Sequence, residues 1–235
     1  MHIGGLMKKA FTLAEILITL GIIGIVAAMT LPTVINNTKA KELETQLKAS
    51  YSILQQALQR MQADTGIIAN QANYPEQTFG KEFIKYFKAT IKCSENTQCM
   101  DSDLENGIGN STFKTYKNFN KTQNLKRGGN LIYDEGKYIL TNNILLLIEC
   151  NTPGFGIILT IDINGPYKKP NLYGHDLFSF NIEEKSGKLL PMGTQGTRYT
   201  DMDIFCSKTS TNGLNGASCT YKAFTETDYF KNLPK

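Results

Sequence analysis

The sequence has few of the residues and motifs on which catalysis depends. It contains only two histidines, His2 and His175. It has no glycine-rich phosphate-binding loop and no metalloprotease motif. Cys150 and His175 are the one candidate pair of catalytic nucleophile and base. No obvious catalytic partner lies near His175 in the sequence. We therefore predict that the protein is not an enzyme, with a membrane-anchored enzyme as the alternative.

Excess charge of one sign is also missing. The chain of 235 residues has a net charge of +4, and Lys8 and Lys9 supply two of those charges. The remainder is close to neutral, which gives little support for a nucleic-acid-binding protein. Hydrophobic residues make up 41% of the chain and are concentrated at its N-terminal end. This composition suits one membrane segment and one modest soluble domain, and it excludes a protein with many membrane spans.

The five cysteines lack the C-x-x-C spacing of zinc ribbons and thioredoxin-like sites. Cys93 with Cys99, and Cys206 with Cys219, form two local pairs that we expect to be disulfides in an oxidising compartment. Cys150 follows an apolar run, so we expect it to be a buried thiol. The alternative is that Cys150 takes a partner from one of the pairs, because sequence alone does not fix the connectivity.

One apolar run, residues 11–31, contains Glu15 as its only charged residue. A helix of this length covers about 30 Å, the thickness of the hydrocarbon core of a bilayer. Because Lys8 and Lys9 precede the run, we expect the N-terminus to stay in the cytoplasm and the rest of the chain to lie outside it. A secretory signal peptide cleaved near residues 27–29 is the rival interpretation. The length of the run, its acid and the amphipathic pattern that follows argue against that rival.

Glu15 is the most informative residue of this run. An unpaired carboxylate in hydrocarbon costs several kcal/mol, so the side chain must be neutralised or paired. The alternative is that Glu15, which lies near the start of the run, reaches back to the lipid headgroups.

The residues around Glu15 form a recognisable signature. The segment Lys8-Lys9-Ala10-Phe11-Thr12-Leu13-Ala14-Glu15 resembles the cleavage and methylation signature of type IV prepilins and type II secretion pseudopilins. The resemblance implies that a dedicated peptidase removes the leader, residues 1–10, by cutting between Ala10 and Phe11. It also implies that the new terminal residue, Phe11, is N-methylated. The family usually has glycine where this chain has Ala10, and Met7 is a second candidate start of the leader.

The resemblance assigns assembly roles to three residues of the apolar helix. It implies that Glu15 pairs with the amine of Phe11 of a neighbouring subunit, which would satisfy the carboxylate in the membrane. Gly24 and Pro32 bound a stretch that bends or melts inside filaments of the family. In the alternatives, Pro32 simply ends the membrane helix, and Gly21 and Gly24 are close-packing sites between helices.

Partners and location follow from the same resemblance. The implied partners are other pilin-like subunits, in a homo- or hetero-filament, the prepilin peptidase, an inner-membrane platform protein and a cytoplasmic assembly ATPase. The implied location is the inner, cytoplasmic membrane, crossed once, with a periplasmic or extracellular head that reaches the cell surface if the filament is a pilus. The filament is either a pilus or a secretion pseudopilus, and the subunit is either major or minor. No cofactor is implied, calcium apart.

The rest of the chain predicts an α+β head packed on a long helix. Apolar residues at steps of three and four from Leu43 to Met61 predict an amphipathic helix over residues 32–65 that ends at Gly66, with a coiled coil as the alternative. For the head, residues 66–235, we predict a short helix near 80–90 and then an antiparallel sheet, the architecture of pilins. The predicted strands are 131–133, 138–141, 144–149, 156–163 and 177–182, with a turn at 134–136 and a half-buried pattern in the last strand.

Two segments of the head are candidate ligand sites. Asp162, Asn164 and Asp176 lie in or beside a turn-rich loop and could supply oxygen ligands for calcium, which some pseudopilins bind, with a metal-free turn as the alternative. The acidic residues at 101, 103 and 105 do not have EF-hand spacing and predict no calcium site. Residues 113–127 interleave five basic residues with aromatic ones, a pattern used to bind single-stranded nucleic acid. The alternative is a solvated loop anchored by its aromatic side chains.

These observations predict a structural subunit of a type IV pilus-like or type II secretion pseudopilus filament. The alternative is a DNA-uptake or adhesive minor pilin whose head binds a ligand.

Overall fold

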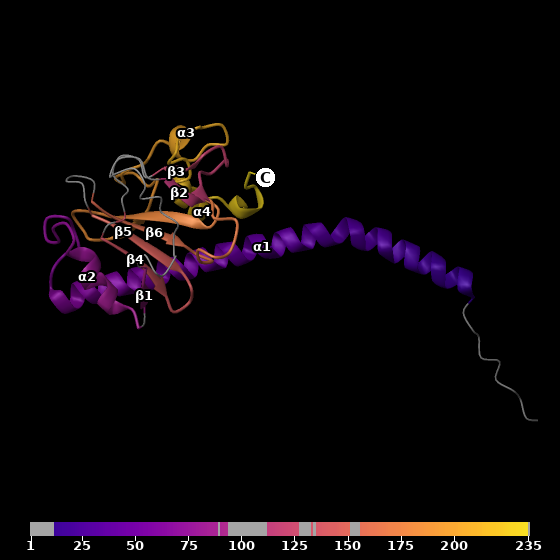
Figure 1. Cartoon of the computed structure of the whole chain (residues 1–235), viewed down its shortest axis with the longest axis horizontal. Helices are drawn as coiled ribbons and strands as arrows, with labels where there is room; N and C mark the ends of the chain where they lie inside the picture. The colour runs from indigo at the N-terminus through magenta and orange to yellow at the C-terminus, as the bar shows by residue number, and fades with distance from the viewer. Residues whose placement is uncertain are drawn as a thin grey trace, which may run out of the picture. The chain divides into compact units, whose positions relative to one another are not determined.

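The computed structural model of the chain describes residues 12–88, 90–93, 112–126, 133, 135–150 and 156–234. The chain divides into two compact units, Met1–Lys41 and Glu42–Lys235, and we name the second the head unit. The boundary falls inside one helix, α1 (Leu13–Thr65), which Figure 1 shows as a continuous coil. The chain is therefore α+β, with a long N-terminal apolar helix and an antiparallel sheet.

Within the head unit, α1 packs on the sheet through the predicted stripe. Leu47, Leu54, Leu58 and Met61 are all almost completely buried, which confirms the amphipathic helix. Tyr51 fixes the helix further: its ring stacks on Phe180 at 5.4 Å, and its hydroxyl donates to the Leu189 carbonyl. Burying these side chains stabilises the head unit by about 2 kcal/mol for each large aliphatic group.

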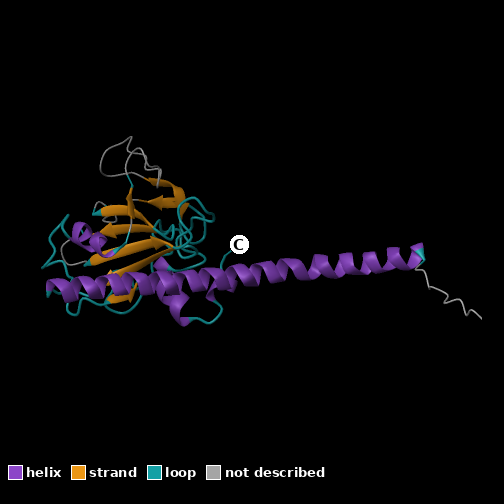
Figure 2. Ribbon diagram, turned by 90° about the horizontal axis from the view of Figure 1, so that it is seen from below, coloured by secondary structure: helices purple, strands orange, loops and turns teal. Residues whose placement is uncertain are grey.

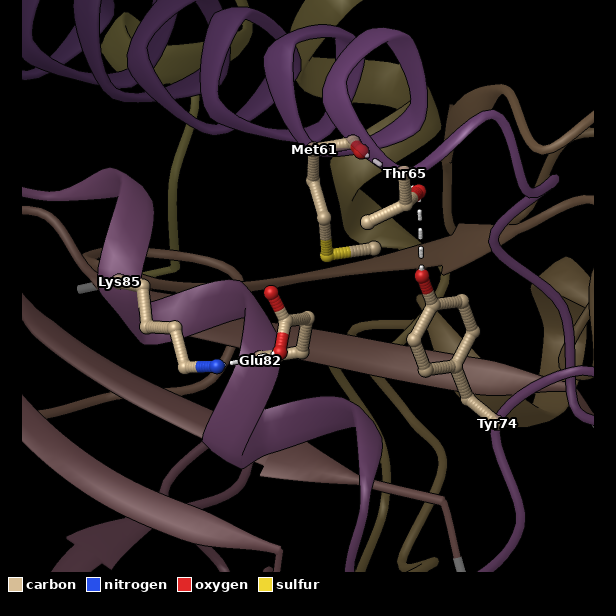
Figure 3. Close-up of polar contacts among 5 residues, drawn as sticks. All are labelled: Met61, Thr65, Tyr74, Glu82 and Lys85. Atoms are coloured by element: carbon tan, nitrogen blue, oxygen red, sulfur yellow. Dashed lines mark hydrogen bonds and ion pairs between the residues drawn. The ribbon is translucent and has the colours of Figure 1, made fainter.

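The end of α1 is set by Gly66, as predicted. Gly66 has a φ of +68°, and its N–H donates to the Gln62 carbonyl at 3.0 Å, which closes the last turn. Figure 3 shows the neighbouring polar contacts: Thr65 Oγ1 donates to the Met61 carbonyl, and the Tyr74 hydroxyl donates to Thr65 Oγ1. These bonds hold the chain against α1 as it turns back toward the sheet.

The short helix predicted near 80–90 is present as α2 (Phe79–Phe83) followed by the 3-10 turn η1 (Ile84–Tyr86). Phe79 and Phe83 are fully buried and stack on each other at 5.1 Å. Lys85 and Glu82, also drawn in Figure 3, form an ion pair at 2.6 Å on the exposed side.

The central sheet has six antiparallel strands in the order β1-β4-β5-β6-β7-β8, drawn in orange in Figure 2. The strands are β1 (Thr90–Lys92), β4 (Gly136–Leu140), β5 (Leu145–Glu149), β6 (Ile157–Asp162), β7 (Leu177–Ile182) and β8 (Leu189–Pro191). The predictions for β5, β6 and β7 are confirmed to within a residue. The turn predicted at 134–136 is wrong at Gly136, which belongs to β4 and pairs with Ile148. Most of the strand predicted before that turn lies outside the described residues.

The half-buried pattern predicted for β7 is wrong, because all six of its residues are buried. On one face, Phe178 and Phe180 contact rings from α1 and from the C-terminal elements. On the other face, Leu177 joins a second core that includes Tyr133 and Tyr173. That second core is covered by the hairpin of β2 (Thr112–Lys117) and β3 (Asn124–Lys126) and by long loops, so both faces of the sheet are shielded.

The C-terminal segment consists of α3 (Met202–Phe205), α4 (Cys219–Thr225) and the 3-10 turn η2 (Tyr229–Lys231). It is tied to the sheet by the Ser179 N–H, which donates to Thr220 Oγ1 at 3.0 Å. Ser179 and Asn181, which gave β7 its polar appearance, are buried with their hydrogen bonds made. A buried polar side chain with its partners in place is tolerated in a core.

Candidate functional site

The N-terminal part of α1 exposes a long row of large apolar side chains. Leu13 is 76% exposed and Met29 is 74% exposed, and every large aliphatic residue between them is at least 44% exposed. Within the part of the chain that the structure describes, α1 is the one helix long and apolar enough to cross a bilayer. A surface of this kind is unfavourable in water and is compatible with a helix that spans a membrane.

Glu15 is held at the first turn of this helix by Thr12. The backbone N–H and the hydroxyl of Thr12 both donate to Glu15 Oε2 at 2.8 Å. The Glu15 N–H in turn points to Thr12 Oγ1 at 3.3 Å. This reciprocal arrangement is a capping box, and it satisfies N–H groups that have no partner within the helix.

Sequence reasoning missed this role of Thr12, although the signal was present. The spacing Thr12-x-x-Glu15 before an apolar run is the pattern of a capping box. The carboxylate of Glu15 therefore has a local structural role as well as the assembly role implied by the resemblance. Phe11 and Ala10, the residues of the predicted cleavage, lie outside the described residues.

The other polar groups of the apolar span bond within the helix. Thr19 Oγ1 donates to the carbonyls of Glu15 and Ile16, and Thr30 Oγ1 donates to the Val26 carbonyl, each at 2.9 Å. In hydrocarbon every polar group needs a partner inside the protein, and these hydroxyls have one. Glu15 is therefore the one polar side chain of the run that carries a charge.

Pro32 lies inside α1 and does not end it, so that alternative is wrong. Because proline lacks an N–H, the Ala28 carbonyl loses its usual partner four residues later, which weakens the helix at this point. A Cβ added at Gly21 or Gly24 would meet nothing within 4 Å, so both glycines lie on an open helix surface. The roles of Gly24 and Pro32 in a filament remain predictions.

Of the predicted disulfides, Cys206–Cys219 is present, with a Cα–Cα distance of 5.0 Å. Cys93 is disulfide-bonded, and its predicted partner Cys99 lies outside the described residues. Cys150 is 1% exposed, and its thiol donates to the Tyr74 carbonyl at 3.5 Å, as expected for a buried thiol. Disulfides persist outside the cytoplasm, which agrees with an exported head.

His175 is buried and bonded to the backbone. Its Nε2 lies 3.0 Å from the Phe119 carbonyl oxygen, and burial lowers the pKa of His175 to about 4. A ring nitrogen that donates to a carbonyl at neutral pH is not free to accept a proton. Cys150 and His175 are thus each bonded to a different backbone carbonyl.

The three residues of the predicted calcium loop come together in the structure. Asp162 Oδ1 accepts the N–H groups of Asn164 and Gly165, at 3.2 and 2.9 Å. The side chain of Asn164 donates to the Lys169 carbonyl at 3.3 Å. Asp176 accepts the backbone N–H groups of Asn171 and Leu172, each at 2.7 Å, from across the loop. These bonds form a turn stabilised by two buried carboxylates.

Two observations bear on whether this loop suits a cation. Burial, and after it the charge of Asp176, raise the pKa of Asp162 to about 7, and burial raises the pKa of Asp176 to about 6. The buried Oδ1 atoms of Asn164 and Asn171 find no hydrogen-bond partner among the described residues. Unsatisfied amide oxygens beside two carboxylates form an oxygen donor set of the kind that calcium accepts. The described residues contain no group of three or more His, Cys, Asp or Glu side chains that could hold a metal ion, so the calcium site of Asp162, Asn164 and Asp176 stays a prediction. Asn171 is a further oxygen donor that sequence reasoning missed.

This loop predicts a linked dependence of stability on pH and calcium. Because the pKa values of Asp162 and Asp176 are raised by folding, the free energy of unfolding should fall as pH rises from about 4 to about 7. Calcium at 100 times its Kd should restore about 2.7 kcal/mol at pH 8 and much less at pH 5, where the carboxyls are protonated. Thermal unfolding of the full chain in detergent, with and without calcium, measures both effects.

The matched controls use one variant inside the loop and one outside it. Asp176→Asn should lose the response to calcium, whereas Asp64→Asn, at the exposed end of α1, should keep it. Equal responses of the two variants, or no response of the unmodified chain at pH 8, would show that the loop is a metal-free turn.

The basic segment 113–127 has buried aromatic side chains where they are described. Tyr116 is fully buried, with its hydroxyl donating to Asp162 Oδ2 at 2.5 Å, and Phe119 is 5% exposed. Neither ring is available to stack on a base, so the described aromatics act as anchors, as the alternative interpretation held. The loop that this alternative expected is wrong, because the segment forms the hairpin of β2 and β3. Lys117 and Lys121 are exposed, and Arg127 lies outside the described residues.

Comparisons of this chain with family models, with curated proteins and with solved structures found no match.

Proposed function

We propose that this chain is a structural subunit of a type IV pilus-like or type II secretion pseudopilus filament. The observation that carries the proposal is the N-terminal part of α1, which exposes its large aliphatic side chains and has one charged group, Glu15, in its first turn. The resemblance of residues 8–15 to the prepilin signature gives this helix its assembly role.

The head unit supports the proposal because it has its own core. Its six-stranded sheet is covered on both faces, and α1 contributes the buried stripe from Leu43 to Met61. The apolar side chains of the first unit are therefore not needed to complete the fold of the head. A subunit with a self-contained head and an uncovered apolar helix can leave the bilayer only if other helices replace the lipid.

Glu15 supports polymerisation over simple anchoring. A membrane anchor gains only a helix cap from this carboxylate, and an unpaired carboxylate costs several kcal/mol in hydrocarbon. The capping box offers Thr12 as partner within one subunit, and it occupies only Oε2. In the proposed filament, the carboxylate pairs with the methylated amine of Phe11 of the next subunit.

The proposal includes the machinery that the family uses. The prepilin peptidase cleaves at Ala10–Phe11. The subunit then stays in the inner membrane with its head outside the cytoplasm until it is assembled. A platform protein and an assembly ATPase then drive its insertion into a filament with other pilin-like subunits. The alternative, a minor pilin whose head binds a ligand, shares all of these steps.

Mass spectrometry of the protein purified from membranes tests the processing step. The mature chain should begin at Phe11 and carry one N-methyl group, and cells without the prepilin peptidase should retain residues 1–10 or 7–10. A chain that begins after Ala28 would show that the apolar run is a cleaved signal peptide and would overturn the proposal.

A further inference from the structure

Three segments of the head unit carry lysine and no acidic residue. These segments are 112–126, 163–175 and 204–225. Together they hold eight lysines, at positions 114, 117, 121, 126, 168, 169, 208 and 222, and neither Asp nor Glu. The chain as a whole has 25 basic and 21 acidic residues, so the positive charge of these segments is offset elsewhere. The near-neutral total therefore conceals an uneven distribution of charge.

The fold joins these three segments to one another. The Lys117 N–H donates to the Asn171 carbonyl at 3.1 Å, and the Tyr173 N–H donates to the Lys117 carbonyl at 2.9 Å. The Phe119 N–H donates to the Asn215 carbonyl at 2.8 Å, which ties the first segment to the third. Figure 1 shows β2 and β3, from the first segment, beside α4, from the third. Lysines far apart in the sequence thus share one region of the head.

Five of these lysines form what we name the lysine surface: Lys117, Lys121, Lys168, Lys169 and Lys208. All five are exposed, and none takes part in the ion pairs found among the described residues. The acids that border the middle segment, Asp162 and Asp176, are fully buried and bonded to backbone N–H groups. Their charge is therefore not available at the surface. Asp203 and Glu226, which border the third segment, are exposed and line one pocket with Lys208, but the five lysines outnumber these two acids.

Two aromatic side chains of the three segments are exposed among the described residues, Tyr167 and, to a smaller extent, Tyr221 at 39%. Tyr167 immediately precedes Lys168 and is 67% exposed, whereas Tyr116 and Phe119 are buried. An exposed ring beside exposed ammonium groups can stack on a nucleobase while the lysines contact phosphates. Tyr167 lies outside the segment that the sequence pattern had indicated.

We propose that the lysine surface binds single-stranded nucleic acid, with Lys117, Lys121, Lys168, Lys169 and Lys208 contacting phosphates and Tyr167 stacking on a base. The surface contains lysine and no arginine among its described residues. The lysine ammonium is a compact point charge. It lacks the planar guanidinium with which arginine binds base edges or carboxylates in a fixed geometry. Binding should therefore be independent of base sequence and strongly dependent on salt. This activity is additional to filament assembly and does not rest on it.

The test is fluorescence anisotropy with the full chain in a neutral detergent and a labelled oligo-dT strand, at 50 to 200 mM salt. The variant Lys117→Gln/Lys168→Gln/Lys208→Gln should bind at least tenfold more weakly at 50 mM salt. It should also lose about 2 from the slope of log K against log salt, since each phosphate contact contributes about 0.7. The matched control, Lys81→Gln/Lys185→Gln/Lys188→Gln, removes three exposed lysines from other parts of the head unit and should bind like the unmodified chain.

A second variant distinguishes a nucleic acid from other polyanions. Tyr167→Ala should weaken binding of oligo-dT several-fold and leave binding of heparin, a polyanion without bases, unchanged. Thermal unfolding confirms that each variant is folded. The proposal is overturned if oligo-dT does not bind at 50 mM salt, or if the control triple variant is as weak as the first. It is also overturned if Tyr167→Ala leaves oligo-dT binding intact, which would indicate an acidic polysaccharide or a lipid surface.

Discussion

Glu15→Val is expected to leave the chain inserted in the membrane and to abolish its assembly into filaments. The variant keeps the length and apolarity of α1, so insertion should be unaffected. It removes the carboxylate that we propose to pair with the amine of Phe11 in a neighbouring subunit. Immunoblots of membranes and of sheared surface or periplasmic fibres measure the two outcomes separately. Normal filaments from this variant would contradict the proposed role.

Glu15→Gln is the sharper experiment, because the structure gives Glu15 two roles. A capping box accepts Gln in place of Glu, so this variant should keep the hydrogen bonds with Thr12 and lose only the charge. If pairing with the amine of Phe11 drives assembly, Glu15→Gln should fail as Glu15→Val does. If Glu15→Gln assembles normally, Glu15 acts as a helix cap and charge pairing is not required. Thr12→Val, which breaks the cap and keeps the charge, provides the reciprocal comparison.

Removing the disulfide in the variant Cys206→Ser/Cys219→Ser is expected to lower the free energy of unfolding of the head unit by about 3 kcal/mol. This value follows from the entropy that the crosslink, which spans 13 residues, removes from the unfolded chain. Both cysteines are buried, and the Gly216 N–H inside the loop donates to the Phe205 carbonyl at 2.7 Å. Denaturant unfolding of the full chain in detergent, with and without reductant, measures the change.

Cys150→Ser is the matched control for that variant. It also replaces buried sulfur with oxygen and leaves the Cys206–Cys219 crosslink intact, and a serine hydroxyl can still donate to the Tyr74 carbonyl. The expected loss is below about 1 kcal/mol. If the double variant is no less stable than Cys150→Ser, the disulfide does not stabilise the head. Loss of the crosslink should also disturb residues 204–225, which carry Lys208 of the lysine surface.

Much of the fold was predictable because its signals are local. The stripe from Leu43 to Met61 repeats at the helical period, and Gly66 takes the left-handed conformation that ends a helix. Strands β5 and β6 are short apolar runs between turn residues, and the sequence placed them to within a residue. The pair Cys206 and Cys219 was visible as two cysteines close together in the chain. The capping box of Thr12 and Glu15 was equally local and could have been found.

The wrong prediction for β7 concerns burial, which depends on contacts between residues far apart in the sequence. Strand β7 alternates apolar and polar residues, a pattern that predicts one solvent-exposed face. In the structure, Ser179 and Asn181 are buried by segments that lie well before and after them in the sequence. A Ser or Asn inside a core is stable only when distant partners complete its hydrogen bonds. Its burial cannot therefore be read from the strand itself. The burial of Tyr116 in the basic segment also depends on a distant partner, because its hydroxyl donates to Asp162.

The sequence by itself determined the apolar helix, its single carboxylate, the signature that surrounds it and the α+β class of the head. Each of these depends on residues that are close together in the sequence. Only the tertiary structure decided that the carboxylates of Asp162 and Asp176 share one buried loop and that three acid-free segments meet in one lysine surface. Electrostatic interactions act through space, so their strength depends on distances that the fold sets and that the order of residues does not contain.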